Sequence, residues 1–518
     1  MKKALLIILD GFGISKKSTG NAVAEAKMPF FKKLLKNHPH TFLQTHGAAS
    51  GLPENQTGAS EPGHVVLGAG RRVWQPLEKI NRDFLSGDIL KNQKFKKFLK
   101  AIVKVKKIHL IGLLSDGGVH SHLSHLENIL EILKSQQKII SKKILIHAIA
   151  DGRDVAPRSI KKYLQNISNK KIGKIASLAG RFFAMDRDQN WDRTEKYFQL
   201  LTKKIGEKKS LENLDEKKIY QNAENDYFIN PCFDEKNFLP IEKNDVVLFF
   251  NFRSDRAAQI STAFCDRNFT EFSDFKMSKD NFFIFGPFCQ FATNIFPPEK
   301  IKNNLGEILE KNNKTQLRIA ETEKFAHVTF FFNSQKKRKN RGEKRILVPS
   351  KKCRSFAEFP EMSAYEITEK LIFEIQNSNF DFIFCNFANA DLVGHSGNFI
   401  AAKKACKTLD KVLSKILPIA QKNNYQILIS ADHGNADEMV DDHGEISMSH
   451  SKATAPLIFI GNQNLALQFK KNLKTRKSRG KMFGVDFFGE LADIAPTILS
   501  ILQIKKPAEM TGKSFLEN

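Results

Sequence analysis

Carboxylate and imidazole side chains stand at several distant points of the chain, most of them just after apolar runs, and together they have the chemistry of a metal centre. The residues are Asp10, Asp391, His395, Asp432, His433 and His450. Carboxylate and imidazole ligands without thiolate suit Mn²⁺ or Zn²⁺, whereas Mg²⁺ usually prefers oxygen ligands alone. Six donors are too many for one tetrahedral site that must also bind a substrate. They suit two adjacent metals, the arrangement used for in-line displacement at phosphorus.

Each of these residues taken singly has a simpler interpretation. An aspartate after a strand is often a helix N-cap, and an isolated histidine is usually a hydrogen-bonded surface or core residue. Asp432 and His433, followed by Gly-Asn directly after an apolar run, favour a metal site, as does the Asp391-x-x-x-His395 spacing after another run. Spacing in the sequence does not by itself show that the six side chains converge.

A loop of small residues around Ser60 is the candidate for a nucleophile. Ser60 lies in Gly-Ala-Ser-Glu-Pro-Gly-His, residues 58–64, and the glycines permit a ligand to approach the backbone closely. A free serine hydroxyl is a weak nucleophile, and no general base adjoins it in sequence, so metal coordination would have to activate it. The alternative is a tight turn in which Ser60 caps a helix; the loop alone favours neither interpretation.

The elements that must position these side chains are short apolar runs ending in polar or glycine residues. The runs span 4–10, 108–116, 144–151, 175–180, 246–253, 380–391, 425–434 and 456–461. Most are continuous rather than alternating, which predicts parallel strands covered on both faces. Residues 361–375 and 401–420 carry apolar residues at helical spacing. The pattern predicts an α/β fold with mostly parallel sheets, whose ligands bind at the carboxyl ends of the strands.

Length and composition exclude several classes of protein. A chain of 518 residues is too long for one ordinary core, so we expect two domains or one domain with a large insertion. No apolar run approaches the roughly 20 residues of a membrane span. The apolar run at the N-terminus stops at Asp10, which indicates a buried strand rather than a signal peptide. The six cysteines form no C-x-x-C pair, which fits a reducing cytoplasm.

The net charge of +26 has two possible origins. One is a nucleic-acid or anionic-membrane partner, and the other is a lysine-rich compositional bias. Lysines are spread along the whole chain, which favours the bias, so we expect neither a nucleic-acid nor a membrane partner. Two basic segments, 335–345 and 469–481, are poor in apolar residues and are interpreted as solvated surface loops.

Longer motifs surround the candidate residues, in order along almost the whole chain. They occupy residues 9–13, 58–71, 114–122, 151–154, 180–188, 251–257, 318–324, 386–395, 431–437 and 494–497. Together they resemble the cofactor-independent phosphoglycerate mutases of the alkaline phosphatase superfamily. The resemblance implies an alkaline-phosphatase-like metal domain with a mostly parallel central sheet, formed by residues 1–75 and 299–518. It also implies an inserted α/β transferase domain, which binds the substrate, over residues 76–298.

The resemblance also implies a function and a set of site residues. The expected enzyme is a metal-dependent isomerase of glycolysis and gluconeogenesis, a cytoplasmic monomer that interconverts 3-phosphoglycerate and 2-phosphoglycerate through a phosphoserine at Ser60. It would use two divalent ions, typically Mn²⁺, and no bisphosphoglycerate. The first metal would be held by Asp391, His395 and His450, and the second by Asp10, Ser60, Asp432 and His433. The substrate would be held by His120, Arg153, Asp154, Arg181, Arg187, Arg253, Arg256 and Lys324.

These side chains suit the expected chemistry. Arginine pairs bidentately with carboxylates, so Arg253 and Arg256 are candidates for a fork that holds glycerate. Lys324 would neutralise phosphoryl oxygens in the transition state. Asp154 is a candidate general acid and base for the glycerate hydroxyls, with a salt bridge to a neighbouring arginine as the alternative. Closure of two domains, hinged near Gln75 and residues 296–298, would keep water from the phosphoserine.

The sequence departs from the family pattern at a few positions. Ala59 and Pro62 stand beside Ser60 where the family usually has Asn and Val, and Ser334-Gln335 replaces a usual glycine pair. The segment around His450 matches weakly, so His443 competes with it as a ligand. The alternative functions are a metal-dependent phosphatase or a phosphopentomutase of the same superfamily. These would share the metal site but lack the arginine-rich segment.

Overall fold

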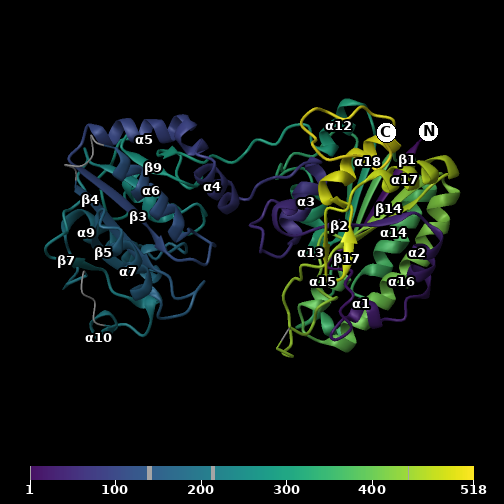
Figure 1. The fold of residues 1–518 in the computed structure, drawn as a ribbon, viewed down its shortest axis with the longest axis horizontal. Coiled ribbons are helices and arrows are strands. Elements are labelled where there is room, and N and C mark those ends of the chain that lie inside the picture. Colours follow the sequence, from purple (N-terminus) through teal and green to yellow (C-terminus); the bar gives the residue numbers. More distant parts are fainter. Residues whose placement is uncertain (1, 137–142, 212–215, 442, 518) are drawn as a thin grey trace. The chain divides into compact units, whose positions relative to one another are not determined.

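Two eight-stranded sheets organise the chain, one in each of two units (Figure 1). The computed structural model describes residues 2–136, 143–211, 216–441 and 443–517. The first unit combines both ends of the chain, Met1–Gln75 and Lys300–Asn518, and the second is Pro76–Glu299.

The sheet of the first unit has the strand order β12-β11-β13-β1-β14-β15-β2-β18. The strands are β1 (Lys3–Leu9), β2 (His40–Gln44), β11 (Gln316–Glu321), β12 (Glu343–Val348), β13 (Phe382–Phe387), β14 (Tyr425–Ser430), β15 (Ala455–Ile460) and β18 (Gly489–Glu490). Strands β12 to β14 are parallel, whereas β15 runs antiparallel to both β14 and β2. Strand β1 lies at the centre and pairs with β13 and β14, so three strand ends that carry candidate ligands are neighbours.

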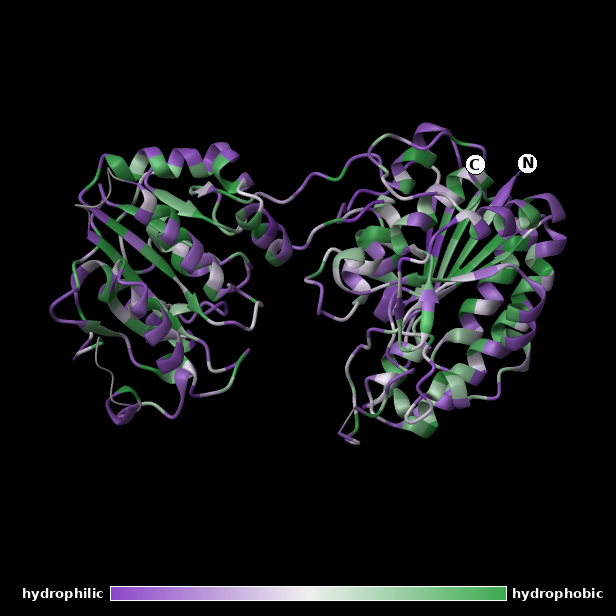
Figure 2. Cartoon of the chain, viewed as in Figure 1, coloured by the Kyte–Doolittle hydropathy of each residue, from purple (hydrophilic) through white to green (hydrophobic). Residues whose placement is uncertain are grey.

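Helices cover this sheet on both faces, as the burial of every residue from Ala4 to Leu9 requires. Helix α16 packs on β14, α14 on β11, α18 on β1 and α17 on β15. The helices of the unit are α1 (Ala22–Glu25), α2 (Pro29–Asn37), α3 (Ser60–Ala69), α12 (Leu305–Lys311), α13 (Thr322–Ala326), α14 (Ala364–Asn377), α15 (Asn389–Gly394), α16 (Phe399–Lys422), α17 (Gln463–Thr475) and α18 (Ile494–Ile501). Figure 2 shows the apolar strands running between helices whose outer faces are polar.

The sheet of the second unit has the order β10-β9-β8-β3-β4-β5-β7-β6 and is parallel except where β7 meets β5. Its strands are β3 (Lys107–Leu114), β4 (Lys143–Ala150), β5 (Lys174–Gly180), β6 (Glu207–Lys209), β7 (Cys232–Asp234), β8 (Val246–Phe249), β9 (Phe282–Ile284) and β10 (Thr293–Asn294). Its helices are α4 (Pro76–Leu85), α5 (Gln93–Val103), α6 (Leu123–Ser135), α7 (Ile160–Asn169), α8 (Arg181–Ala184), α9 (Trp191–Lys203), α10 (Glu216–Ile219) and α11 (Ala258–Cys265).

The predicted α/β class with mostly parallel sheets is confirmed. Each apolar run named from the sequence contains a strand, and the two predicted helices correspond to α14 and α16. A two-stranded antiparallel sheet of β16 (Gly480–Met482) and β17 (Val485–Phe487) completes the first unit. Within the described residues, no helix is long and apolar enough to cross a membrane.

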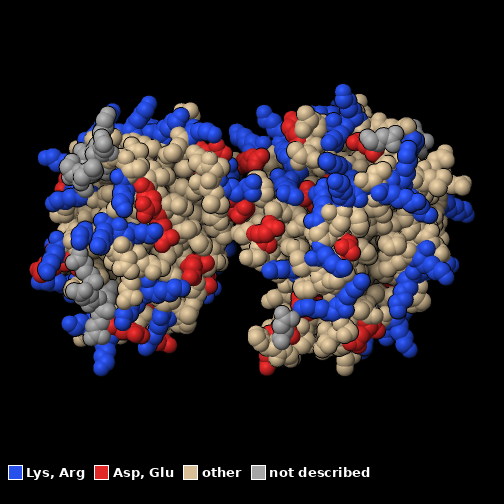
Figure 3. Space-filling model, viewed as in Figure 1, with Lys and Arg blue, Asp and Glu red and all other residues tan. Residues whose placement is uncertain are grey.

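The interpretation of the two basic segments as solvated loops is wrong in part. Residues 469–475 belong to helix α17, because Phe469 is buried and stacks on Phe459 and Phe515 while the lysines face outward. Residues 343–345 begin strand β12, where the buried Glu343 pairs with Arg345. Over the visible faces, Lys and Arg are spread across both units rather than gathered in one area (Figure 3).

Candidate active site

A cluster of two imidazoles and a carboxylate forms at the carboxyl edge of the first sheet. The Nε2 atoms of His395 and His450 lie 3.0 Å apart, and each is 3.3 Å from Asp391 Oδ1. Each ring uses its other nitrogen, Nδ1, to contact a backbone carbonyl: that of Met448 for His395 and that of Gly58 for His450. In a neutral ring, a proton held on Nδ1 leaves the Nε2 lone pair free to bind a cation.

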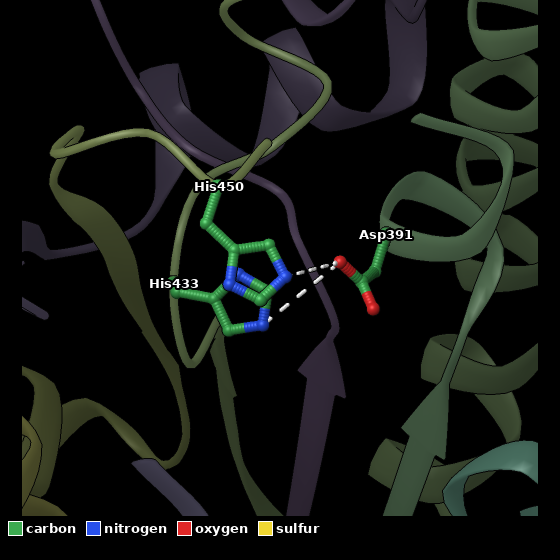
Figure 4. Close-up of side chains that lie close together, drawn as sticks. All are labelled: Asp391, His433 and His450. Atoms are coloured by element: carbon green, nitrogen blue, oxygen red, sulfur yellow. Dashed lines mark ion pairs between the residues drawn. The ribbon is translucent and has the colours of Figure 1, made fainter. Parts of the chain in front are cut away.

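Local backbone structure brings the members of this cluster together. Asp391 lies in the short helix α15 directly after β13, and His395 follows one turn later, so both side chains share one face. His433 follows β14, and an isolated β-bridge between Gly434 and Ser451 holds His450 beside it. The rings of His433 and His450 stack with centroids 4.0 Å apart, and both face Asp391 (Figure 4).

The hydroxyl of Ser60 lies at the centre of a second, adjoining group. Ser60 is the first residue of α3, whose N-cap residue Ala59 is extended and makes no side-chain capping hydrogen bond. Its Oγ is 2.8 Å from His433 Nε2 and 3.1 Å from Asp10 Oδ1. Lys324 Nζ donates to Ser60 Oγ at 2.7 Å, to Asp10 Oδ1 at 2.7 Å and to Asp391 Oδ2 at 2.6 Å. Ser60 is 6% exposed, so the hydroxyl is nearly shielded from bulk water.

The electrostatics of the cluster are dominated by buried opposite charges. Burial opposes the charge of Lys324, but Asp10, Asp391 and Asp432 outweigh it and raise the pKa of Lys324 above its usual range. Burial likewise opposes the charge of Asp10 and Asp391, yet Lys324 and the histidines hold both pKa values well below their ordinary range. Burial would lower the pKa of His433, but the surrounding carboxylates raise it to about 10.

The donor set fits divalent cations. Asp10, Asp391 and Asp432 are all buried, and the positive charges of Lys324 and the protonated His433 lie beside them, two against three carboxylates. Asp432 Oδ2 makes no hydrogen bond. Buried carboxylates in excess of their counter-charges are costly unless a cation binds them. Imidazole and carboxylate donors are those that Mn²⁺ and Zn²⁺ accept.

The distances divide the ligand-capable atoms differently from the sets implied by the resemblance. One compact group is Asp391, His433 and His450, and the other is Asp10, His64 and Asp432. His433 Nε2 lies between the groups, at 3.4 Å from Asp10 Oδ1 and 4.0 Å from Asp391 Oδ1. His395 remains beside the first group. The ligand sets therefore stay predictions, although all the predicted ligands belong to or adjoin these groups.

The structure distinguishes between His450 and His443, the two histidines that compete as a metal ligand. His450 points into the cluster, whereas His443 lies on an exposed loop, where its backbone N–H donates to Asp441 Oδ1 at 2.9 Å. Of the two competing histidines, the structure brings only His450 to the candidate ligands.

Sequence reasoning missed two buried residues beneath the site. His64 Nδ1 lies 2.9 Å from the backbone oxygen of Ser60 and 3.2 Å from Asp432 Oδ2. Asn386 Nδ2 donates to Asp10 Oδ2 at 2.8 Å and lies 3.0 Å from His64 Nε2. Both residues fall inside the motifs named above, four residues after Ser60 and at the end of β13, which was the available sequence signal.

The predicted substrate residues of the second unit gather around the loops that follow its strands. Arg181 is fully buried, and its Nη1 donates to Asp151 Oδ1 at 2.6 Å and to Asp154 Oδ2 at 2.5 Å. The salt bridge considered as the alternative role of Asp154 is therefore present. His120 Nε2 lies 3.9 Å from the same Asp154 oxygen. Burial and the charge of Arg181 lower the pKa of His120 to about 4, so its ring is neutral near pH 7.

Asp255, which sequence reasoning also missed, joins several members of this arginine group. Its carboxylate lies 2.9 Å from Arg187 Nη1, 3.2 Å from Arg253 Nε and 3.7 Å from His120 Nδ1. Arg256 Nη1 donates to the carbonyl of Met185 at 3.2 Å. Burial and the charges of the neighbouring arginines 187, 181 and 153 lower the pKa of Arg256. The predicted residues of the second unit thus form one strongly cationic group, whereas Lys324 lies with Ser60 in the first unit.

Comparison with known proteins places the chain in a family. Residues 2–506 match the model of the metalloenzyme superfamily. The 2,3-bisphosphoglycerate-independent phosphoglycerate mutases of Clostridium botulinum and Saccharophagus degradans are each 41% identical to it, over 100% of this chain and 99% of theirs. The chain belongs to the family of 2,3-bisphosphoglycerate-independent phosphoglycerate mutases. The resemblance found in the sequence is thereby confirmed.

A solved structure agrees with this assignment. The crystal structure of Leishmania mexicana phosphoglycerate mutase at low cobalt concentration superposes with a TM-score of 0.61 at 27% sequence identity. The match covers 99% of this chain and 97% of that one. Membership in a metalloenzyme superfamily and the fit of the donor set together indicate that the protein binds divalent metal.

Proposed function

We propose that the protein is a 2,3-bisphosphoglycerate-independent phosphoglycerate mutase that interconverts 3-phosphoglycerate and 2-phosphoglycerate through a phosphoserine at Ser60. The observation that carries the proposal is the environment of Ser60 Oγ, within 3.1 Å of Lys324 Nζ, Asp10 Oδ1 and His433 Nε2. A serine placed among a cation and hydrogen-bond acceptors, next to a metal-ligand cluster, has the groups that phosphoryl transfer needs.

Two divalent ions, which we propose to be Mn²⁺, would be held by Asp391, His395 and His450 and by Asp10, Ser60, Asp432 and His433. When bound, they would supply positive charge that favours the serine alkoxide and the transferring phosphoryl oxygens.

The residues of the first unit would carry the transfer to and from serine. The Ser60 hydroxyl proton passes to a neighbouring acceptor as Oγ attacks phosphorus, and the bond from phosphorus to the glycerate oxygen breaks. Lys324 then donates a hydrogen bond to the serine oxygen. Its positive charge also offsets the negative charge that develops on the phosphoryl oxygens. In the second half of the reaction, the other glycerate hydroxyl attacks phosphoserine and Ser60 regains its proton.

The residues of the second unit would hold glycerate between the two transfers. Arg253 and Arg256 would bind its carboxylate, because guanidinium groups pair bidentately with such anions. Asp154 would exchange protons with the glycerate hydroxyls, and its hydrogen bond from Arg181 would fix its orientation. Neutral His120 would offer a hydrogen bond without adding charge.

We also propose the domain organisation, oligomeric state and compartment that the family implies. Residues 1–75 and 299–518 would form the metal domain, and residues 76–298 the inserted transferase domain. The protein would act as a cytoplasmic monomer on a small phosphorylated substrate. None of its six cysteines is in a disulfide, which supports a reducing compartment.

The test is to assay purified protein for conversion of 3-phosphoglycerate to 2-phosphoglycerate by ³¹P NMR, without bisphosphoglycerate. Reactions with EDTA, and with EDTA followed by excess Mn²⁺, should show activity lost and then restored. Ser60→Ala should be inactive, whereas the exposed Ser86→Ala should match the wild type. Acid quenching during turnover should trap phosphate on the peptide that contains Ser60.

Two results would overturn the proposal. Release of inorganic phosphate without 2-phosphoglycerate under every metal tested would leave a phosphatase of the same superfamily. Full mutase activity in Ser60→Ala would exclude the phosphoserine.

A further inference from the structure

His64 is a buried histidine that lies directly beneath the candidate nucleophile. It follows Ser60 by one turn of α3, so the two residues share a face of this helix. Its ring is fully buried and packs against the rings of His327 and Phe384, with centroids 5.3 Å and 5.9 Å away. These neighbours keep bulk water from the imidazole and restrict its rotation.

The Nδ1 atom of His64 faces the backbone of the nucleophile. It lies 2.9 Å from the carbonyl oxygen of Ser60, which can only accept a hydrogen bond, so this contact requires the ring proton on Nδ1. The same nitrogen is 3.2 Å from Asp432 Oδ2, but that oxygen makes no hydrogen bond. The ring therefore donates to the carbonyl of the first residue of α3 and holds the helical turn that carries Ser60.

The Nε2 atom of His64 faces an amide whose orientation is fixed by a carboxylate. Asn386 Nδ2 donates to Asp10 Oδ2 at 2.8 Å, and an ionised carboxylate can only accept. Turning this amide over would place its oxygen against the carboxylate oxygen. Asn386 Nδ2 also lies 3.0 Å from His64 Nε2, so its second hydrogen points to the ring and Nε2 accepts it. Both contacts of the ring thus require the same tautomer, with the proton on Nδ1.

This arrangement distinguishes His64 from two other histidines of the site. His395 and His450 also direct Nδ1 to a backbone carbonyl, but their Nε2 atoms lie 3.3 Å from Asp391 Oδ1, at the ligand cluster. In His64 the Nε2 lone pair is taken by Asn386. Distance alone groups His64 with two carboxylates as a possible metal ligand, yet its ring has no lone pair left for a cation.

We propose that His64 is a positioning residue of the candidate active site and not a metal ligand. Through Nδ1 it fixes the backbone of Ser60, and through Asn386 it fixes Asp10, whose Oδ1 lies 3.1 Å from Ser60 Oγ. One ring thereby joins the nucleophile and a candidate ligand carboxylate in a single hydrogen-bonded network. Its effect on turnover rests on the proposed function, whereas its tautomer and the number of bound ions do not.

The first experiment separates a positioning residue from a ligand by counting bound ions. Electron paramagnetic resonance of free Mn²⁺ gives the number and affinity of bound ions in a titration, and thermal unfolding shows whether each variant is folded. His64→Phe should bind as many ions as the wild type, with affinity weakened by about 10- to 100-fold. His64→Asn should lie between the two, because it restores a donor to Ser60 but no acceptor for Asn386. Loss of one ion per chain in both variants would show that His64 is a ligand.

The second experiment reads the tautomer in the full-length wild-type protein and needs no folded variant of altered function. Long-range ¹H–¹⁵N correlation spectra of ¹⁵N-histidine-labelled protein distinguish a proton on Nδ1 from one on Nε2, and the signals missing in His64→Asn identify the residue. The ring should carry its proton on Nδ1 both without metal and with saturating Zn²⁺. A proton on Nε2, or a Nε2 resonance that moves to a metal-bound position when Zn²⁺ is added, would overturn the proposal.

The kinetic test separates positioning of the nucleophile from binding of the substrate. In His64→Phe, kcat for 3-phosphoglycerate conversion at saturating Mn²⁺ should fall by about 10- to 100-fold while KM changes by less than about twofold. His64→Asn should recover part of kcat. His38→Asn, at a half-buried histidine that ends α2, is the matched control and should equal the wild type.

Two kinetic outcomes have separate meanings. A raised KM with unchanged kcat in His64→Phe would contradict the positioning role. A wild type without mutase activity would refute the proposed function, and the tautomer and the number of bound ions would still decide whether His64 is a ligand.

Discussion

The ammonium group of Lys324 and the hydroxyl of Ser60 are 2.7 Å apart in the interior of the first unit. The same ammonium group contacts Asp10 and Asp391, so one cation touches both the candidate nucleophile and carboxylates of both ligand groups. Because the contact is buried, the positive charge acts on the serine oxygen with little screening by water.

Replacing Lys324 by Met should lower kcat by about 10²- to 10³-fold, the usual cost of removing a donor to developing negative charge. Initial rates of 3-phosphoglycerate conversion at saturating Mn²⁺ provide the measurement. Lys91→Ala, which removes an exposed lysine paired with Asp88, is the control and should leave the rate unchanged. A Lys324→Met enzyme within a factor of two of wild type would exclude the proposed role.

Replacing Asn386 by Leu should weaken the metal site, because the amide that orients Asp10 is lost. Loss of such supporting hydrogen bonds typically reduces metal affinity or activity by about 10- to 100-fold. Metal titration by calorimetry should show weaker Mn²⁺ binding, independently of the assay. Asn377→Ala, which removes an exposed amide on α14, should bind Mn²⁺ as the wild type does; equal affinity in both variants would contradict the role given to Asn386.

Replacing Asp255 by Asn should raise KM about tenfold with a smaller effect on kcat, because a charge-assisted contact that orients Arg187 and Arg253 is weakened. Steady-state kinetics over a wide range of 3-phosphoglycerate concentrations would separate the two constants. Asp83→Asn, on the surface of α4, serves as the comparison. A fall in kcat with unchanged KM would show that Asp255 acts in the transition state instead.

Stability should fall on acidification because two histidines are buried in contact in the second sheet. His109 Nδ1 lies 2.9 Å from His147 Nε2. The other ring nitrogen of His147 contacts the Ser177 hydroxyl, and the other ring nitrogen of His109 contacts the Asp245 carboxylate. Burial lowers the pKa of both rings, so they stay neutral in the fold while the unfolded chain binds protons below pH about 6.5. The contribution of the two neutral histidines to the free energy of unfolding is present above that pH. It is lost as the pH falls, at up to about 1.4 kcal/mol per pH unit for each proton.

Urea unfolding between pH 7.5 and 5 would measure this slope. His147→Gln should show a shallower dependence of the unfolding free energy on pH than the wild type. His443→Gln, which removes an exposed histidine, should leave the slope as it is. Parallel curves for all three proteins would contradict the assignment.

Glu321 should make the protein less stable as the pH rises through neutrality. Its side chain is buried at the end of β11, Oε1 has no hydrogen bond, and burial raises its pKa to about 7. Because only the protonated form of Glu321 is compatible with burial, its contribution to the free energy of unfolding is complete below the unfolded pKa of about 4.5. The contribution is lost as the pH rises through the folded pKa of about 7.

Glu321→Gln should therefore be more stable than the wild type at pH 8, by about 3 kcal/mol, and nearly equal to it at about pH 4. Thermal unfolding at the two pH values would show the difference. Glu369→Gln, at an exposed position of α14, should change neither value. A variant less stable than wild type at pH 8 would show that the ionised carboxylate is held by partners in the fold.

The sequence alone determined the fold class and most of the candidate site. Continuous apolar runs such as residues 4–9 predict buried parallel strands, and the side chains at the ends of such strands meet at one sheet edge. This reasoning made Asp10, Asp391 and Asp432 candidates for one site, and in the structure they lie together because β1 lies between β13 and β14. Local pattern is sufficient here because strand burial and strand-end position are properties of short segments.

The tertiary structure decided what depends on contacts between distant segments. The bridge from Gly434 to Ser451 selects His450 over His443, although both lie in the same polar stretch. The hydrogen bond from Asn386 to Asp10 likewise follows from packing. Sequence spacing gives no distance across a fold, because a loop can direct its side chains in many ways until packing and hydrogen bonds fix one of them.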